Sequence, residues 1–96
     1  MAAFVYIMPS RRNGTIHLGS TGNLARRAWK HRNAVVAGFT KRHRCHLLVW
    51  YEVHETLEDV RLCERQMKEW RRAWKLRAIE GVNPEWEDQF DCVVHL

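Results

Sequence analysis

Two short apolar segments near the beginning of the chain predict a β-hairpin. They span residues 3–8 and 15–19 and consist largely of apolar, aromatic and β-branched side chains, which favour strands. Asn13 and Gly14 lie between them, and both residues tolerate the positive φ angles of hairpin turns. Pro9 has no backbone N–H to donate to a sheet. We therefore expect Pro9 to end the first strand and the loop to be longer than a two-residue turn.

The segment after the hairpin has the spacing of an amphipathic helix. Its apolar stripe recurs at intervals of four, three and four residues and consists of Leu24, Ala28, His31 and Val35. Ser20 and Thr21 are residues of the kind that cap helix N-termini, and Gly38 interrupts the pattern. We expect a helix that begins after this pair and ends near Ala34.

Residues 46–53 predict a third strand. This segment, HLLVWYEV, is apolar nearly throughout and contains several strand-forming residues. A strand that alternates cleanly between apolar and polar positions has one exposed face, whereas a continuous apolar run favours burial on both faces. We expect a strand covered on both sides.

A long amphipathic stretch extends from residue 57 to residue 80. Its stripe has the three- and four-residue spacing of a helix and consists of Val60, Cys63, Met67, Trp70 and Trp74. Thr56 followed by Asp59 resembles a capping box. No Gly or Pro interrupts the stretch, so one continuous helix and two helices with a bend near Trp70 both fit. The pattern ends before Pro84.

These elements predict an α/β protein of the α+β kind. We expect a sandwich with a central three-stranded antiparallel sheet flanked by helices, in the order β-β-α-β-α-α if the last helical stretch is divided. A chain of 96 residues with 46% hydrophobic composition is sufficient for one core. We assign residues 1–86 to the folded domain, and residues 87–96, which show no clear period, to an acidic C-terminal tail.

Apolar segments and cysteines bear on where the protein functions. No stretch approaches the ~20 apolar residues of a transmembrane helix, and the first ten residues lack an export pattern. The three cysteines are odd in number, which favours reduced thiols in a reducing compartment. We expect a cytoplasmic protein without a membrane partner. Cys45-His46 and Cys92-x-x-His95 lack the paired spacing of zinc knuckles, so they predict no zinc site.

Charge is distributed unevenly along the chain. Residues 1–79 contain all 16 Lys and Arg against six acids, whereas residues 80–96 contain five acids and no Lys or Arg. The first segment therefore carries about ten net positive charges. Such a surface attracts polyanions and gives a salt-sensitive affinity for nucleic acid.

Five short motifs follow one another between residues 4 and 86. They are Val5-Tyr6-Ile7, Ile16-His17-Leu18-Gly19, Asn23-Leu24 with Arg27 and His31, Glu64 within Cys-Glu-Arg-Gln-Met-Lys, and Asn83-Pro84-Glu85-Trp86. Each motif alone is weak, but the ordered set resembles the GIY-YIG nucleases. Within that family it is similar to small stand-alone proteins distantly related to the N-terminal nuclease domain of bacterial excision repair. His17 stands where the family usually has its second motif tyrosine, and Val5 replaces the glycine of the first motif.

The resemblance implies a metal-dependent endonuclease that hydrolyses DNA phosphodiester bonds and leaves 5′-phosphate and 3′-hydroxyl ends. It implies one Mg²⁺ or Mn²⁺ ion per site, with Glu64 as the metal ligand, and no organic cofactor. It also matches Tyr6, Arg27, His31 and Asn83 to catalytic positions, Asn83 as a supporting residue.

The chemistry needs these residue types. A carboxylate holds a divalent cation against the scissile phosphate, and an arginine fork contacts two phosphate oxygens and keeps its charge. Arg27 and His31 are four residues apart, so a helix places both on one face.

The proton acceptor is left open between Tyr6, His17 and both. A phenol with a pKa near 10 is a poor base unless nearby positive charge favours its ionised form. Imidazole titrates near neutral pH, so His17 accepts a proton from water more readily. Equally, loss of the tyrosine hydroxyl at this position could leave an inactive nucleic-acid-binding module. Charge segregation alone suggests a third alternative, a protein-interaction domain whose acidic tail covers its own basic face.

Further basic residues are expected to bind phosphate groups. They are Arg11, Arg12, Arg26, Lys30, Lys41, Arg42 and Lys68. We expect DNA as the partner, with RNA left open, and a monomer or weak dimer.

Overall fold

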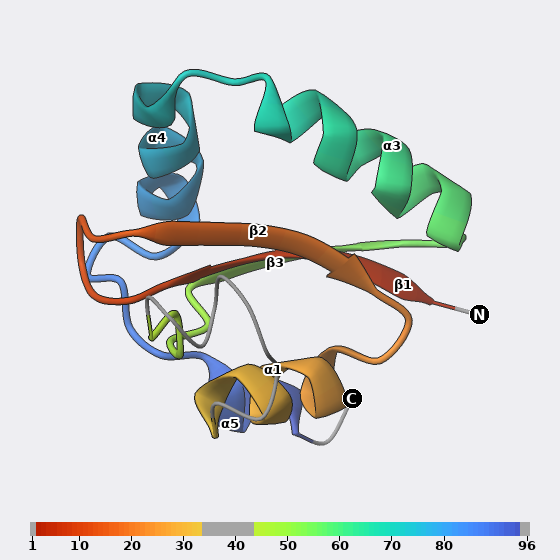
Figure 1. The fold of residues 1–96 in the computed structure, drawn as a ribbon, viewed down its shortest axis with the longest axis horizontal. Coiled ribbons are helices and arrows are strands. Elements are labelled where there is room, and N and C mark those ends of the chain that lie inside the picture. The colour runs from red at the N-terminus through yellow and green to blue at the C-terminus, as the bar shows by residue number, and fades with distance from the viewer. Residues whose placement is uncertain (1, 34–43, 95–96) are drawn as a thin grey trace.

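The computed structural model describes residues 2–33 and 44–94. A three-stranded antiparallel sheet with strand order β2-β1-β3 forms its centre. Helices α3, Leu57–Lys68, and α4, Arg72–Val82, lie on one side of this sheet, and α1, Leu24–Arg32, and α5, Phe90–Val93, lie on the other (Figure 1). The predicted α+β architecture and its order β-β-α-β-α-α are confirmed, and α5 adds a short final helix.

The predicted hairpin consists of β1, Ala3–Pro9, and β2, Ile16–Thr21. Pro9 ends the first strand as expected, and the backbone N–H of Ser10 donates to the carbonyl of Thr15 at 2.9 Å to close the loop. Asn13 adopts a φ of 60°, as anticipated from its tolerance of left-handed backbone.

The third strand, β3, is shorter than predicted. It spans Trp50–His54 and pairs with the other edge of β1. Leu47 and Val49 already donate backbone hydrogen bonds to β1, each at 3.3 Å, so the chain runs beside β1 before the regular strand begins. Val53 is 58% exposed, so burial on both faces is wrong for this part of the segment. As an edge strand, β3 has less protein around it than a central strand.

Alternation along β1 divides the core into two layers. Ala3, Val5 and Ile7 are buried with residues of α3 and α4, whereas Tyr6 and Met8 are buried with residues of α1 and α5. Successive strand residues point to opposite faces, so one apolar strand supplies both layers. This is why its sequence is apolar almost throughout.

Helix α1 begins later than predicted. Its N-cap is Asn23, whose side-chain oxygen accepts a hydrogen bond from the backbone N–H of Arg26 at 3.1 Å. The expected capping by Ser20 and Thr21 is wrong, because both residues belong to β2. The buried stripe of Leu24, Ala28 and His31 is confirmed, and Val35 and Gly38 lie outside the described residues.

The long amphipathic stretch forms two helices, separated at residues 69–71. Thr56 caps α3 by accepting a hydrogen bond from the backbone N–H of Asp59 at 3.1 Å, which agrees with the predicted helix start. Val60 and Met67 are buried, but Trp74 is 48% exposed. The core role that the periodicity indicates for Trp74 is wrong, because the stripe changes direction where α3 ends.

Residues 87–94 belong to the folded body. Gln89 N–H donates to the carbonyl of Leu48 at 2.7 Å, and Leu48 N–H donates to the Asp88 carboxylate at 3.1 Å. Val93 is fully buried. The described part of the acidic C-terminal segment therefore covers one face of the sheet, where Asp88 also forms an ion pair with Arg32.

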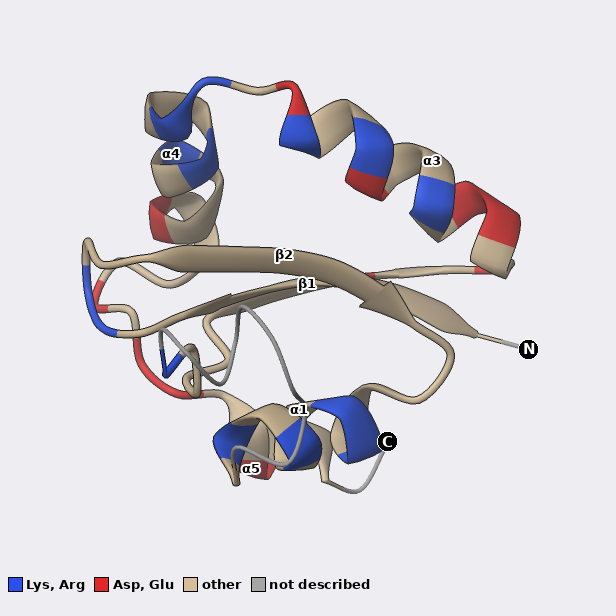
Figure 2. Ribbon diagram, viewed as in Figure 1, with Lys and Arg blue, Asp and Glu red and all other residues tan. Residues whose placement is uncertain are grey.

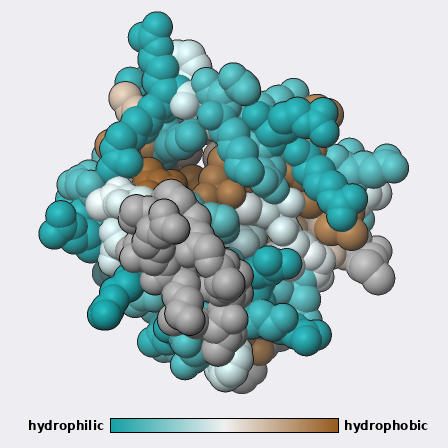
Figure 3. Space-filling model, in the orientation of Figure 1, coloured by the Kyte–Doolittle hydropathy of each residue, from teal (hydrophilic) through white to brown (hydrophobic). Residues whose placement is uncertain are grey.

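Charged residues lie mainly on the helices and loops. Lys and Arg are absent from the three strands and are concentrated on α1, α3, α4 and the hairpin loop (Figure 2). The surface in the same view is largely hydrophilic, with apolar side chains visible only in patches (Figure 3). None of the helices described here is long and apolar enough to cross a membrane.

The cap of α3 gives a test of the fold. We expect Thr56→Ala to lower the free energy of unfolding by about 1 kcal/mol, because the backbone N–H of Asp59 loses its acceptor. Urea unfolding followed by circular dichroism measures this change. Thr56→Ser keeps the acceptor and should retain most of the stability; equal losses in both variants would contradict the capping role.

Candidate active site

Three rings from separate elements form the centre of the site. They belong to Tyr6 on β1, His17 on β2 and His31 on α1. The Tyr6 hydroxyl lies 3.1 Å from His31 Nε2, and the two imidazole centroids are 5.0 Å apart. The Tyr6 and His17 centroids are 5.9 Å apart. The structure thus brings together three of the residues that the motifs single out.

The register of the hairpin explains this convergence. His17 is paired with Met8, and Gly19 is paired with Tyr6. Directly paired residues point to the same face of an antiparallel sheet, and the face of Tyr6 and Met8 is the one covered by α1. His17 therefore lies on the same side of the sheet as His31.

Gly19 makes room for the Tyr6 hydroxyl. A Cβ atom at this position would lie 2.6 Å from the Tyr6 oxygen and 3.2 Å from His17 Nε2. These separations are too short for any other residue without movement of the ring. The glycine of the second motif is therefore required for space at the site.

A second group of side chains lies on the opposite face of β2. Ser20 is paired with Val5, whose side chain packs with α3. The Ser20 hydroxyl donates to Oε1 of Glu64 at 2.5 Å, and the Lys68 ammonium lies 2.6 Å from Oε2 of the same carboxylate. These contacts hold the Glu64 carboxylate beside β2.

The two groups lie on opposite faces of β2. Within the described residues, β2 is an edge strand of the sheet. The charge of Glu64 acts on both Tyr6 and His17, and that of Lys68 acts on His17. We therefore treat the edge of β2 as one site with residues on both of its faces.

Burial keeps the three rings uncharged at neutral pH. It raises the pKa of Tyr6 to about 12, and this effect outweighs the opposing charge of Arg27. Burial lowers the pKa of His31 to about 4, together with repulsion from His17, when that imidazole is protonated, and from Arg27. A protonated phenol and a neutral imidazole can form a hydrogen bond, and the Tyr6 hydroxyl and His31 Nε2 do so at 3.1 Å.

His17 differs from Tyr6 in its capacity to accept a proton. Burial and the charge of Lys68 lower the pKa of His17 below its usual value of 6.5, and the charge of Glu64 opposes them. The imidazole is therefore mostly neutral at pH 7, and a neutral imidazole is the form that can take up a proton. The phenol of Tyr6 has a pKa too high for this role.

The Glu64 carboxylate suits a divalent cation. Burial acts to raise its pKa, but hydrogen bonds from Lys68 and Ser20 outweigh this effect and lower the pKa, so the group is ionised at neutral pH. The side chain of Lys68 is 55% exposed and that of Glu64 is 20% exposed, so the Lys68 ammonium can move into solvent when a dication takes its place. Mg²⁺ typically uses one or two carboxylates together with waters and substrate phosphate. The donor chemistry of Glu64 fits that ion.

Arg27 lies next to a basic pocket at the beginning of α1. This pocket has a volume of about 490 Å³ and is lined by Thr21, Gly22, Asn23, Arg26, Arg27 and Lys30. Arg27 is exposed, and its charge acts on all three rings of the site. The cations of Arg26, Arg27 and Lys30, all carried by α1, form a suitable environment for phosphate.

The remaining predicted residues occupy different surroundings. The Asn83 side chain is buried and donates to the carbonyls of Val49 and Glu87 at 3.0 and 2.9 Å. Its amide thus joins the end of α4 to the strand segment before β3, which is a supporting position. Arg11 and Arg12 are exposed in the hairpin loop, where Arg12 pairs with Glu85. Lys41 and Arg42 lie outside the described residues.

The sequence pattern does not indicate the contact of Ser20 with Glu64, nor the space that Gly19 leaves for the Tyr6 hydroxyl. Ser20 directly follows the glycine of the second motif, and alternation along a strand places it on the face opposite to Gly19. Its contact with Glu64 spans 44 residues of sequence. A pattern of local spacing cannot indicate that pairing.

The chain belongs to the GIY-YIG family. The family model for the GIY-YIG catalytic domain matches residues 2–77. The fold is also similar to the solution NMR structure of a UPF0213 protein from Bacillus halodurans, with a TM-score of 0.56 and 24% sequence identity, over 93% of this chain and 94% of that one. None of the curated proteins compared with the chain matches it significantly. Membership supports a nuclease-type function with nucleic acid as the substrate.

The contact between Gly19 and Tyr6 can be tested directly. We expect Gly19→Ala to reduce the free energy of unfolding by about 1–3 kcal/mol, because the added methyl group overlaps the Tyr6 hydroxyl. Thermal and urea unfolding measure the loss.

Gly81→Ala is the matched control. A Cβ at Gly81, in α4, meets nothing within 4 Å, and alanine favours helix over glycine. This variant should be as stable as the original protein or slightly more so. A Gly19→Ala protein of unchanged stability would show that the Tyr6 ring does not require this space.

Proposed function

We propose that this protein is a metal-dependent endonuclease that cleaves DNA by a GIY-YIG-type mechanism in which His17 accepts the proton of the attacking water. One observation carries the proposal: an ionised carboxylate, Glu64, and a neutral imidazole, His17, lie around the same edge of β2. Hydrolysis of a phosphodiester needs both a cation ligand and a proton acceptor.

Glu64 is the residue that would hold the cation, with Mg²⁺ or Mn²⁺ as the expected ion. When bound, such an ion neutralises charge on the phosphate and on the departing oxygen. Ser20 keeps one oxygen of the Glu64 carboxylate in place through its 2.5 Å hydrogen bond. Lys68 neutralises the carboxylate in the absence of another cation.

The basic pocket at α1 provides the substrate contacts. Arg27 binds the scissile phosphate and stabilises the charge that accumulates on its oxygens, while Arg26 and Lys30 bind neighbouring phosphates. The pocket is polar and open at the surface, as contact with a nucleic-acid backbone requires. These contacts do not depend on base identity.

His17 removes the proton from water as the water oxygen attacks phosphorus. A bond forms between that oxygen and phosphorus, and the bond from phosphorus to the 3′ oxygen breaks. The proton of the water goes to the imidazole, and the 3′ oxygen takes a proton from solvent. The products are a 5′-phosphate and a 3′-hydroxyl.

Tyr6 and His31 position the proton acceptor in this proposal. The Tyr6 hydroxyl remains protonated because its pKa is about 12, and it is hydrogen-bonded to His31 Nε2 at 3.1 Å. The rings of this pair lie beside the His17 ring, with centroid distances of 5.9 Å from Tyr6 and 5.0 Å from His31. A histidine at the second motif position thereby replaces the tyrosine as proton acceptor.

The alternative is a binding module of the same fold that no longer cleaves. The observation that favours it is the high pKa of Tyr6, since this residue cannot replace the missing motif tyrosine as a base. Cleavage assays distinguish the two functions.

Cleavage of supercoiled plasmid and of labelled branched, nicked and single-stranded DNA is the direct test. We expect cleavage with Mg²⁺ or Mn²⁺ and none with EDTA. Glu64→Gln and His17→Phe should each reduce the rate by about 10²–10⁴-fold while leaving salt-sensitive DNA binding intact. Glu69→Gln, which changes an exposed carboxylate immediately after α3, should cleave normally. Binding without metal-dependent cleavage, with activity appearing only in His17→Tyr, would establish the binding module instead.

The pH dependence of the rate identifies the proton acceptor. Because the pKa of His17 is lowered, we expect the rate to fall with acidity only below pH 6.5, where the imidazole becomes protonated. Removing the positive charge in Lys68→Met should raise the pKa of His17 and shift this acidic limb to higher pH. Lys75→Met removes a lysine on α4 and serves as the control. A limb that stays unchanged in both Lys68→Met and His17→Tyr would exclude His17 as the base.

A further inference from the structure

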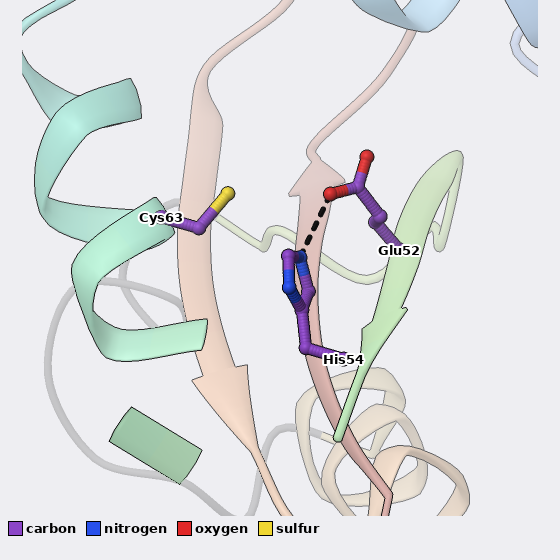
Figure 4. A group of neighbouring side chains, drawn as sticks. All are labelled: Glu52, His54 and Cys63. Atoms are coloured by element: carbon purple, nitrogen blue, oxygen red, sulfur yellow. Dashed lines mark hydrogen bonds and ion pairs between the residues drawn. The ribbon is translucent and has the colours of Figure 1, made fainter. Parts of the chain in front are cut away.

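A second group of ligand-type side chains lies at the other edge of the sheet. Glu52 and His54 belong to β3, and Cys63 belongs to α3. One ligand atom from each of them lies within 4.8 Å of the others, and the three side chains point toward one another (Figure 4). The proposed active site surrounds β2, whereas this cluster is at β3, on the far side of β1.

The fold accounts for the convergence. Glu52 and His54 are two residues apart in a strand, so their side chains share one face. Their partners on β1 are Val5 and Ala3, which are buried on the face covered by α3. Cys63 comes from this covering helix. The residue that follows it, Glu64, contacts β2 instead, so consecutive residues of α3 serve opposite edges of the sheet.

The interactions within the cluster already involve the atoms that ligate metals. His54 Nε2 lies 2.8 Å from Oε1 of Glu52. The Cys63 thiol donates to the Met67 sulfur at 3.8 Å. Burial raises the pKa of the Cys63 thiol, and the negative charge of Glu52 raises it further. A dication bound to these side chains would displace the thiol proton of Cys63. Its charge would also offset the repulsion between the Cys63 thiolate and the Glu52 carboxylate.

We propose that Glu52, His54 and Cys63 form a transition-metal site that takes Zn²⁺ and joins α3 to β3. Sulfur, nitrogen and oxygen donors together suit Zn²⁺ rather than Mg²⁺, which prefers oxygen ligands alone. Three protein ligands leave a fourth tetrahedral position for water. Tetrahedral ligands at normal Zn²⁺ distances are separated by roughly 3.5 Å, so the side chains need only a small contraction.

Exposure of the ligands permits this contraction. The side chains of Glu52 and His54 are 51% and 26% exposed, so rotation of Glu52 disturbs little packing and His54 needs only a small shift. Cys63 is held more firmly by the core around it. Metal binding would therefore draw the two strand residues toward the helix, and the bound ion would raise the melting temperature by favouring the folded state.

Titration of the purified, reduced protein with Co²⁺ tests this site. Co²⁺ substitutes for Zn²⁺ and reports thiolate ligation through a charge-transfer absorption band. We expect one equivalent to bind with this band, Zn²⁺ to displace it, and Zn²⁺ to raise the melting temperature. Cys63→Ser should abolish the band, and His54→Gln, a change at the sheet edge, should weaken Co²⁺ binding roughly tenfold or more.

Two controls separate this site from other thiols and from the active site. Cys92→Ser changes an exposed cysteine and should keep the band. Glu64→Gln, expected to prevent DNA cleavage, should also keep it, so failure of the nuclease proposal would not affect this result. Absence of the band in the folded protein, its persistence in Cys63→Ser, or its loss in Glu64→Gln would each overturn the proposal.

Discussion

The register of the β1–β2 hairpin determines which side chains reach the site. Pairing of Tyr6 with Gly19 and of Met8 with His17 places all the rings on the α1 face, and it leaves Ser20 on the α3 face. A shift of one residue would reverse the faces of β2. His17 would then point toward α3, and Ser20 would no longer contact Glu64. The loop from Ser10 to Thr15 fixes this register, and Arg72 of α4 supports it through hydrogen bonds to the carbonyls of Asn13 and Gly14.

The same constraint explains how the groups of the site differ in charge. Burial on the face toward α1 keeps Tyr6, His17 and His31 neutral. The face toward α3 offers hydrogen-bond donors, so Glu64 is ionised despite partial burial. These two environments lie on opposite faces of β2, so they are separated by a single strand at the edge of the sheet. In the proposed mechanism, a neutral proton acceptor and an anionic cation ligand act on one phosphate, with Arg27 on the adjacent helix.

The sequence predicted the helices and strands better than the tertiary contacts between them. Alternation and helical spacing identified the hairpin, the stripe of α1 and the cap at Thr56, because each depends on residues close together in the chain. The N-cap of α1 was placed too early, since Ser20 and Thr21 are suitable capping residues that the sheet uses instead. The break between α3 and α4 lacks Gly and Pro, so local pattern could not place it. Ordered motifs indicated Tyr6, His17, Arg27, His31 and Glu64 as one site, but the contact of Ser20 with Glu64 and the cluster at Cys63 depend on tertiary packing.

Paramagnetic relaxation by Mn²⁺ tests most directly whether the two faces of β2 form one site. Amide NMR signals of the protein would be recorded with a short DNA duplex and substoichiometric Mn²⁺, beside the Glu64→Gln variant. If one cation serves both faces, signals of Ser20, His17 and Arg27 should broaden together, and this broadening should disappear in Glu64→Gln. Broadening that reaches Ser20 but not His17 or Arg27, or that persists in the variant, would contradict the account.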